Sequence, residues 1–357
     1  MCSVEKGNVL GNGGYSTVYE LMVHPVDKEH QSPDNKSRAW DTANLRKETL
    51  SRKASISTVA TSIYSNDEDA EISPEKQNQS FCTCDERGPR DVKYILQREP
   101  SDKFVMKVIR KGLPKPKRER SYSSLLNEAD MLSSLSHPHI VNMKTLIQEK
   151  PDNPTLVIER VGRTLRSTLP LWKDEIDKSS KLESVHMQKR LVVARGITAA
   201  LAYLHGKNII MRDIKPDNIC IIDETHAKIF DFGLSKILKH SDKTIYEGRY
   251  LATQCVGSVK YMAPEVYSST IYGVSADIYS FTLVLWEILS METCFMKYEN
   301  AQDMARYVYQ RGRRPHVPWS WDVDLRKFLK KGWSKDISSR PTANMIEKVL
   351  NSLIVEA

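Results

Sequence analysis

Residues 211–233 read MRDIKPDNICIIDETHAKIFDFG. They place a carboxylate (Asp213), an ammonium (Lys215) and an amide (Asn218) within six residues, and a second carboxylate, Asp231, after two short apolar runs. The two runs predict a strand hairpin, which would bring Asn218 close to Asp231. Amide and carboxylate oxygens are hard ligands that suit Mg²⁺. The stretch therefore predicts a magnesium site beside a free Asp213.

A glycine-rich turn near the N-terminus predicts contact with phosphates. The segment 11–18, GNGGYSTV, stands between two apolar runs with strand-like alternation. Glycines in such a turn let backbone amides approach phosphate oxygens, and the strand-turn-strand setting favours a flap over a nucleotide rather than a dinucleotide fold. An ordinary hairpin has the same composition, so the interpretation depends on the other motifs. No GxxxxGK[ST] string occurs, which disfavours a P-loop NTPase.

Apolar periodicity outside residues 24–100 predicts short strands first and long helices after them. A helix is expected from about Ser123, with Glu128 on or beside its apolar face. A buried carboxylate needs a cation, because an unpaired buried charge is very costly; alternatively, the helix is rotated and Glu128 faces water. Strands are also expected at 104–109 and 155–159, and helices at 191–205, 276–289, 324–333 and 343–353.

Residues 24–100 differ in composition from the rest of the chain. They hold nine Ser, five Thr, 12 Lys/Arg and 14 Asp/Glu, with few sustained apolar patterns. Such a segment buries too little apolar surface to offset the entropy lost on ordering. We predict a mobile insertion here, within a single domain formed by the remaining residues.

Composition and charge narrow the class of protein. The 357 residues are 40% hydrophobic and 27% charged, and the longest nearly uncharged apolar stretch, 278–286, is far below the roughly 20 residues of a membrane span. Six scattered cysteines and a polar N-terminus predict a location in the cytosol, or in the nucleus. The net charge is +8, and residues 107–120 are strongly basic. That run has no interleaved aromatics and two prolines, so we predict a solvated loop and disfavour nucleic acid as a partner.

Together these motifs give a sequence that resembles the eukaryotic protein kinase family. The lysine and glutamate of the family match Lys107 in FVMKV and Glu128 in LLNEADML, and YMAPE at 261–265 matches the end of the activation segment. The segments YSFTLVLWEIL, GRRPHVP and LKKGWSKDISSRPT look most like the tyrosine-kinase-like branch. A lysine two residues after Asp213 is what serine/threonine kinases carry.

The resemblance implies an α+β, two-lobed protein kinase fold over residues 5–354. A small antiparallel-sheet N-lobe with one main helix would occupy about 5–160, and a larger, mainly helical C-lobe about 161–354, with ATP in the cleft. The implied activity is transfer of the γ-phosphate of ATP to Ser/Thr hydroxyls of protein substrates. Two alternatives stay open: a pseudokinase that acts as a signalling scaffold, and a basic nucleic-acid-binding module.

The resemblance also implies roles for individual residues. Lys107 would hold the α- and β-phosphates and be positioned by Glu128, Asp213 would orient the acceptor hydroxyl and take its proton, and Lys215 would balance charge on the γ-phosphate. Magnesium would be held by Asn218 and Asp231. The implied ATP-binding residues are Gly11, Gly13, Gly14, Val18, Val105, Lys107, Ile158, Glu159 and Val161.

Regulation is predicted at Arg212, Thr253 and Ser258. In kinases with an arginine at the position of Arg212, a phosphate on the activation segment commonly pairs with it, and Thr253 is the favoured acceptor here. Alternatively, the loop hydroxyls only contribute solubility and backbone carbonyls satisfy Arg212. The sequence departs from the family pattern at Met211, where histidine is usual, and at Thr282, where glycine is usual; Ser258 stands in place of the usual threonine.

Overall fold

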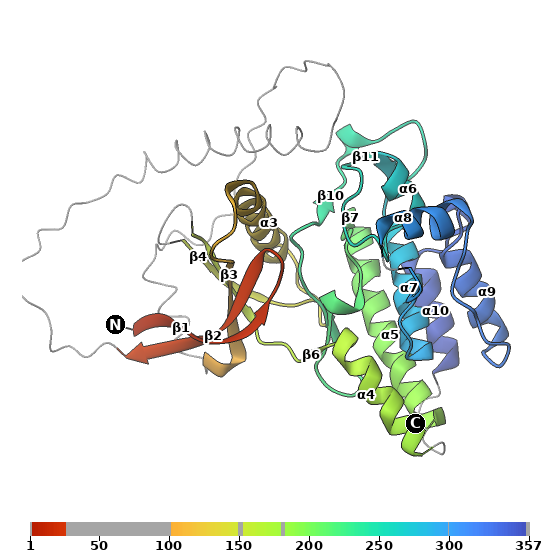
Figure 1. Cartoon of the computed structure of the whole chain (residues 1–357), viewed down its shortest axis with the longest axis horizontal. Helices are drawn as coiled ribbons and strands as arrows, with labels where there is room; N and C mark the ends of the chain where they lie inside the picture. The colour runs from red at the N-terminus through yellow and green to blue at the C-terminus, as the bar shows by residue number, and fades with distance from the viewer. Residues whose placement is uncertain (1, 26–100, 149–152, 180–182, 299, 355–357) are drawn as a thin grey trace, which may run out of the picture. The chain divides into compact units, whose positions relative to one another are not determined.

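The computed structural model describes residues 2–25, 101–148, 153–179, 183–298 and 300–354. They form two compact units, a strand-rich unit (Met1–Ala129 with Met143–Arg160) and a helix-rich unit (Asp130–Asn142 with Val161–Ala357) (Figure 1). The antiparallel sheet and the helical unit confirm the two-lobed kinase fold. The predicted insertion at 24–100 lies outside the described residues, except for its first two residues, which end strand β2.

The strand-rich unit is built on a five-stranded antiparallel sheet with the order β1-β2-β3-β5-β4. Its elements are β1 (Cys2–Asn12), β2 (Ser16–Pro25), η1 (Ser101–Lys103), β3 (Phe104–Ile109), α3 (Lys115–Ser133, whose last residues belong to the other unit), β4 (Met143–Ile147) and β5 (Thr155–Glu159). The strands predicted at 104–109 and 155–159 are thus confirmed.

Strand register places four of the predicted ATP-binding residues on one face of this sheet. Val18 lies opposite Lys107, and Val105 lies opposite Ile158. Residues two apart on a strand share a face, so all four side chains lie on the same face of the sheet. The opposite side carries a separate apolar cluster of Leu21, Phe104, Met106 and Val157.

Helix α3 begins eight residues before its predicted start, and the predicted loop at 107–120 is wrong at both ends. Lys107 still belongs to β3, and the helix begins at Lys115. Pro116 falls in the first turn, where a missing N–H costs no helical hydrogen bond. The lysines and arginines that suggested a loop are also good helix formers. Glu128, on the same helix, is 1% exposed, which excludes the rotated alternative.

The helix-rich unit surrounds a central helix, α7. Residues 276–289 of α7 are buried throughout, as expected of a helix that is apolar on every side. Helices α5 and α9 pack against α7, and α10 packs against α5 (Figure 1). The helices are α4 (Leu165–Lys178), α5 (Glu183–Gly206), α6 (Pro264–Ser268), α7 (Ser275–Ser290), α8 (Ala301–Asp303), a π-helical turn (Met304–Gln310), α9 (Val323–Gly332) and α10 (Ala343–Leu353).

Short strand pairs complete this unit. They are β6 (Arg163–Thr164), β8 (Ile219–Ile221) and β9 (Ala227–Ile229) in one sheet, β7 (Ile209–Ile210) with β10 (Lys236–Ile237), and β11 (Tyr250–Leu251) with β12 (Ile271–Tyr272). Residues 130–142 also belong here rather than to the strand-rich unit. The backbone N–H of Val141 donates to the Ile229 carbonyl at 3.0 Å, and that of Ile229 donates to His139 at 2.9 Å. These bonds attach the segment to strand β9.

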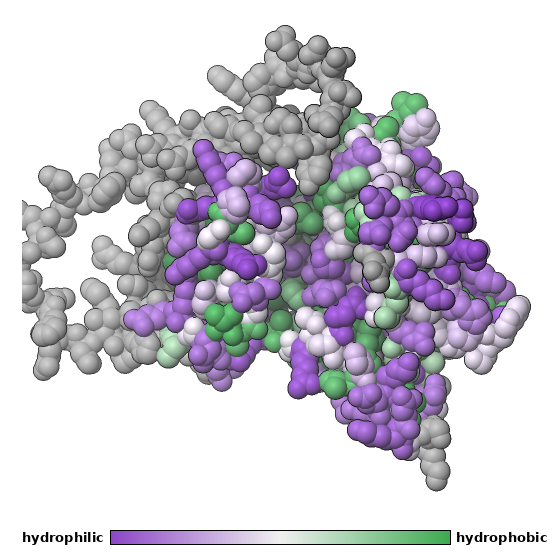
Figure 2. Space-filling model, viewed as in Figure 1, coloured by the Kyte–Doolittle hydropathy of each residue, from purple (hydrophilic) through white to green (hydrophobic). Residues whose placement is uncertain are grey.

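Hydrophilic side chains cover most of the helix-rich unit in the view of Figure 2, including the side where α9 lies. Among the described residues, no helix has both the length and the apolar character needed to cross a membrane.

Candidate active site

The glycine-rich turn joins β1 to β2 and is closed by a hydrogen bond from the Gly13 N–H to the Ser16 carbonyl at 2.8 Å. A Cβ atom built on Gly11 or Gly14 would meet nothing within 4 Å, and neither residue has a positive φ. Neither internal packing nor backbone conformation therefore explains these two glycines. Room for an external group beside the backbone does explain them, which fits the phosphate-binding role predicted for the turn.

Lys107 and Glu128 form a buried ion pair within the strand-rich unit. The Lys107 Nζ lies 2.6 Å from Oε2 of Glu128, and the two residues are 9% and 1% exposed. Burying a charge pair costs desolvation energy, which the Coulomb attraction between the two charges offsets only when their geometry is good. The pair keeps the lysine charge on the same sheet face as Val18 and Val105.

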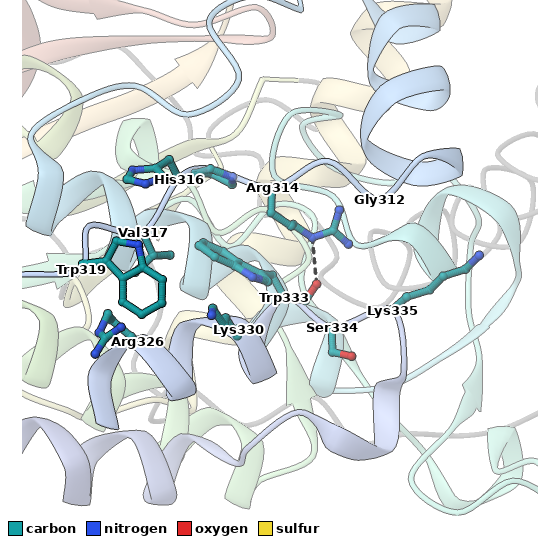
Figure 3. A pocket seen from close by; sticks show the side chains of 11 residues that line it. Gly312, Arg314, His316, Val317, Trp319, Arg326, Lys330, Trp333, Ser334 and Lys335 are labelled. Atoms are coloured by element: carbon teal, nitrogen blue, oxygen red, sulfur yellow. Dashed lines mark hydrogen bonds between the residues drawn. The ribbon is translucent and has the colours of Figure 1, made fainter. Parts of the chain in front are cut away.

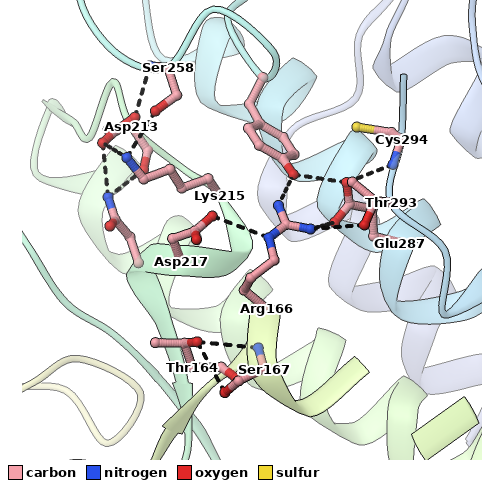
Figure 4. Close-up of polar contacts among 12 residues, drawn as sticks. Thr164, Arg166, Ser167, Asp213, Lys215, Asp217, Ser258, Glu287, Thr293 and Cys294 are labelled. Carbon is pink, nitrogen blue, oxygen red and sulfur yellow. Dashed lines mark hydrogen bonds and ion pairs between the residues drawn. The ribbon is translucent and has the colours of Figure 1, made fainter. Parts of the chain in front are cut away.

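In the helix-rich unit, Asp213 is the centre of a compact polar cluster (Figure 4). Its Oδ2 accepts hydrogen bonds from Lys215 Nζ at 2.7 Å and from Asn218 Nδ2 at 3.0 Å, and its Oδ1 accepts one from the Ser258 N–H at 2.9 Å. Lys215 also donates to Ser258 Oγ at 2.8 Å. The structure thus brings together Asp213, Lys215 and Asn218 and adds Ser258 to them. The prediction of a free Asp213 is wrong, because its carboxylate accepts hydrogen bonds from Lys215, Asn218 and Ser258.

Two features hold this loop in shape. The Asp277 carboxylate accepts the backbone N–H groups of Met211 and Arg212 at 2.8 and 2.9 Å. Gly257 has a φ of +105°, and a Cβ on it would lie 2.1 Å from the Arg212 carbonyl oxygen. Only glycine allows this close approach, which places the N–H of Ser258 on Asp213.

The donor set for a magnesium ion lies at one end of the β8–β9 hairpin. The N–H of Phe230 donates to the Asn218 carbonyl at 3.0 Å, so the hairpin pairs Asn218 with the residue directly before Asp231. Asn218 Nδ2 points toward Asp213, which turns its Oδ1 the other way. An amide oxygen and a carboxylate are ligands of the kind that Mg²⁺ takes, so these residues fit the ion.

The remaining predicted ATP-binding residues are divided between the two units. Ile158 and Glu159 end β5, and the next residue, Arg160, donates its N–H to the Lys103 carbonyl at 2.7 Å. Val161 is the first residue of the segment 161–357 in the helix-rich unit. Each unit therefore assembles its own part of the predicted set.

Two of the three regulatory candidates, Arg212 and Thr253, lie next to Tyr272, whereas Ser258 contacts Asp213 and Lys215. Arg212 donates from Nε to the Leu234 carbonyl at 2.6 Å, in agreement with the carbonyl alternative, while its buried Nη1 has no hydrogen-bond partner among the described residues. Thr253 is exposed, and its carbonyl accepts from the Tyr272 hydroxyl at 2.5 Å. Burial raises the pKa of Tyr272, and the nearby charge of Arg212 opposes that shift. Regulation by phosphate stays a prediction.

Sequence reasoning missed Arg166 of α4, whose guanidinium joins three parts of the unit (Figure 4). It pairs with Glu287 of α7 at 3.1 Å and with Asp217, the neighbour of Asn218, at 3.4 Å, and it bonds to the Tyr261 hydroxyl. Burial alone would lower the pKa of Arg166, but Glu287 and Tyr261 raise it. Glu287 within an apolar helix was the available signal, because a buried carboxylate needs a cation.

The end of the activation segment is fixed by a second ion pair. Arg340 donates to both carboxylate oxygens of Glu265, from Nη1 at 2.6 Å and from Nη2 at 2.8 Å. A bidentate arginine–carboxylate pair sets orientation as well as distance. It therefore anchors the 261–265 segment that follows Ser258.

Comparison with known proteins agrees with this geometry. The protein kinase domain family matches residues 90–351, well over half of the chain. Serine/threonine-protein kinase STY17 of Arabidopsis thaliana is 34% identical over 56% of this chain and 35% of its own length, and Serine/threonine-protein kinase VIK, also of Arabidopsis thaliana, is 31% identical over 64% and 50%. Dual specificity protein kinase shkE of Dictyostelium discoideum is 28% identical over 67% and 32%. The match thus spans half or less of each of these relatives, and it shows that the chain belongs to the protein kinase family.

Proposed function

We propose that this chain is an active, ATP-dependent serine/threonine protein kinase. The observation that carries the proposal is the cluster around Asp213, in which a lysine, an amide and a backbone N–H all converge on one carboxylate. The relatives named as serine/threonine kinases, and the lysine two residues after Asp213, support Ser and Thr as acceptors. The relatives named as dual-specificity kinases make tyrosine the acceptor to test beside them.

The proposed reaction transfers one phosphoryl group. The acceptor hydroxyl oxygen forms a bond to the γ-phosphorus, the bond from that phosphorus to the bridging β–γ oxygen breaks, and ADP leaves. We assign Asp213 to orient the hydroxyl and to take its proton, and Lys215 to offset negative charge on the transferred group. Ser258 holds both groups, because its N–H contacts Asp213 and its hydroxyl contacts Lys215.

Phosphate and metal binding complete the proposal. Lys107, held by Glu128, is assigned to bind the α- and β-phosphates, and the turn at 11–14 is assigned to bind the triphosphate group of ATP. Asn218 and Asp231 are assigned to Mg²⁺, which when bound neutralises phosphate charge. Protein substrates follow from the kinase family, and their identity is left to experiment.

The alternative is a pseudokinase that uses the same fold as a scaffold. A pseudokinase usually lacks a charged group needed for transfer. This chain has each of these groups: Lys107, Glu128, Asp213, Lys215 and Asp231. Nothing among the described residues favours it.

The test is magnesium-dependent transfer of the γ-phosphate of ATP to peptide libraries with Ser, Thr or Tyr as the single acceptor. We expect transfer to Ser and Thr, its loss on chelation of Mg²⁺, and its loss in Lys107→Met and Asp231→Asn while the domain stays folded. Lys107→Met should also lower the thermal stability, because it leaves the buried Glu128 without its cation. The matched control is Lys348→Met, an exposed lysine on α10. Nucleotide binding without transfer in the unchanged protein would favour the scaffold instead.

A further inference from the structure

A groove in the helix-rich unit lies far along the chain from the residues assigned to ATP, magnesium and phosphate transfer. It has a volume of about 570 Å³ and runs between the loop 312–319 and helix α9 (Figure 3). We call it the Trp319 groove; its main lining residues are Pro315, Val317, Trp319, Arg326, Lys330 and Trp333. Trp333, at 4% exposure, packs as part of the core, whereas Trp319 is exposed.

The charge of the groove has one sign. Each ionisable side chain that lines it is basic: Arg314, His316, Arg326, Lys330 and Lys335. Residues 306–335 carry nine Lys/Arg against two Asp/Glu, whereas the whole chain has a net charge of only +8. A single-sign surface of this kind raises the local concentration of an oppositely charged partner and speeds its association.

Trp319 gives the groove an apolar contact point. It is 80% exposed, and the guanidinium of Arg326 lies 4.9 Å from its ring centroid. Arg326 is itself fixed by a hydrogen bond from Nε to the Trp321 carbonyl at 3.0 Å. The indole is thus held in place while exposed, and a large fixed aromatic beside cations is the composition of a binding hot spot.

We propose that the Trp319 groove binds an acidic peptide segment of the protein substrate, with an apolar side chain of that segment packed on Trp319. This inference rests on the proposed function, because it adds a docking site to the kinase. Carboxylates of the segment complement the cations of α9, among which Arg326 and Lys330 are four residues apart and share one helix face. The apolar lining of Pro315, Val317 and Trp333 suits a peptide side chain. A nucleic acid would instead need a longer track of phosphate contacts.

Binding is tested first without phosphate transfer, so that the result does not depend on the proposed activity. The probe is a fluorescent 12-residue peptide of Asp and Glu with one central Leu-Phe pair, titrated with the full chain and followed by anisotropy. We expect binding that weakens steeply with salt and weakens about tenfold or more in Trp319→Ala and in Lys330→Glu. The matched controls are Met345→Ala and Lys348→Glu, exposed residues of α10 outside the groove, which should change affinity less than about twofold.

Three outcomes would overturn the proposal. The first is that the groove variants and the control variants weaken peptide binding equally. The second is that a single-stranded oligonucleotide binds more tightly than the peptide and that Trp319→Ala abolishes its binding. The third is that the chain associates with itself and that Trp319→Ala abolishes this association. If transfer is observed, the acidic segment is joined to an acceptor peptide, and the KM of the joined peptide is compared with that of the acceptor peptide alone. The added segment should lower KM about tenfold in the unchanged protein and should not change KM in Lys330→Glu, and kcat should be the same in both proteins. Peptide binding without any transfer would leave the docking site intact and reject only the kinase activity.

Discussion

Two buried carboxylates, Glu128 and Glu287, interrupt apolar helix faces, and each meets a cation from another element. The same rule, that an unpaired buried charge is very costly, applies to both. For Glu128 its place beside an apolar helix face predicts a cation, and the kinase resemblance then names Lys107 as the partner. The rule was not applied to Glu287, since Arg166 lies 121 positions away and looks like a surface residue of an amphipathic helix.

Removing the hydroxyl of Ser258 tests whether its bond to Lys215 matters for transfer. In Ser258→Ala the backbone N–H still reaches Asp213, but Lys215 loses one of its two partners. A hydrogen bond to a charged group contributes about 1.5–3 kcal/mol, so we expect kcat to fall about tenfold or more with little change in melting temperature. Ser258→Thr should restore kcat, and Ser268→Ala, at an exposed residue of α6, should leave it unchanged. A kcat in Ser258→Ala equal to that of the unchanged protein would contradict the assignment.

Arg166→Met should lower the free energy of unfolding by about 3 kcal/mol, because it leaves the fully buried Glu287 without its cation. Chemical denaturation measures this change. The double variant Arg166→Met/Glu287→Gln should recover part of the loss, since no buried charge is then unpaired. Lys173→Met is the matched control: its partner Glu292 is exposed and 3.8 Å away, so its effect should stay within about 0.5 kcal/mol.

At the scale of elements, the packing of α7 on α9 explains a departure from the family pattern. Thr282 stands where the family usually has glycine, and it is fully buried. The space for its side chain comes from Gly332 at the end of α9, where an added Cβ would lie 2.1 Å from Thr282 Oγ1. The Thr282 hydroxyl is satisfied within its own helix, by the Ile278 carbonyl at 2.7 Å.

This pairing predicts a non-additive result. Gly332→Ala should destabilise the protein by about 1–3 kcal/mol, the usual cost of overpacking a core. In a Thr282→Gly background the same substitution should be nearly neutral, because the clashing hydroxyl and methyl are gone. A double-mutant cycle by denaturant unfolding gives the coupling energy, and additive effects would show that α9 moves away from α7 at no cost.

Elements with a clear period were predictable from the sequence, and those fixed by distant contacts were not. Strand β3 and helix α10 match their predicted bounds, because β3 is a short continuous apolar run and the apolar residues of α10 recur with the helical period. Helix α4 was missed because Pro170 lies inside it, and the β7–β10 pair is too short to give a pattern. In the site, the spacing within 211–233 and the resemblance to protein kinases pointed to the motif residues, whereas the contact of Ser258 with Lys215 joins positions 43 apart in the chain and leaves no local pattern.

At the scale of the whole molecule, burial of His139 predicts sensitivity to acid. Burial lowers the pKa of His139, and the nearby His226, Arg195 and Lys228 lower it further, against the raising effect of its bond to Ala227. The folded state therefore binds this proton less readily than the unfolded state. Stability should fall as the pH drops through about 6.5, the ordinary histidine value.

Unfolding curves between pH 8 and pH 5 measure that loss. His139→Asn keeps a donor for the Ala227 carbonyl, now 2.7 Å from His139 Nδ1, and cannot titrate. It should flatten the decline in stability below about pH 6.5. His240→Asn, at an exposed residue, should leave the decline unchanged. If stability falls with decreasing pH equally steeply in His139→Asn and His240→Asn, the acid sensitivity belongs to groups other than His139.

The connection between β2 and β3 predicts that the long segment between them is dispensable for folding. The two strands pair directly and antiparallel, a geometry that a short hairpin loop can join. Replacing residues 26–100 with a short Gly/Ser linker should shift the melting temperature by no more than about 3 °C, because closure entropy depends weakly on loop length. Scanning calorimetry measures this shift. A large drop in the melting temperature would mean that the segment contributes to the stability of the strand-rich unit.

The attachment of the 211–213 loop to Asp277 bears on how freely this chain can change over evolution. The aspartate binds main-chain N–H groups of positions 211 and 212, atoms that every amino acid except proline provides. The geometry of the loop therefore does not depend on which side chain stands at position 211, where a buried methionine replaces the histidine usual in the family. A lineage can exchange that side chain for another of similar volume without disturbing Asp213, whereas the single carboxylate at position 277 has no such freedom.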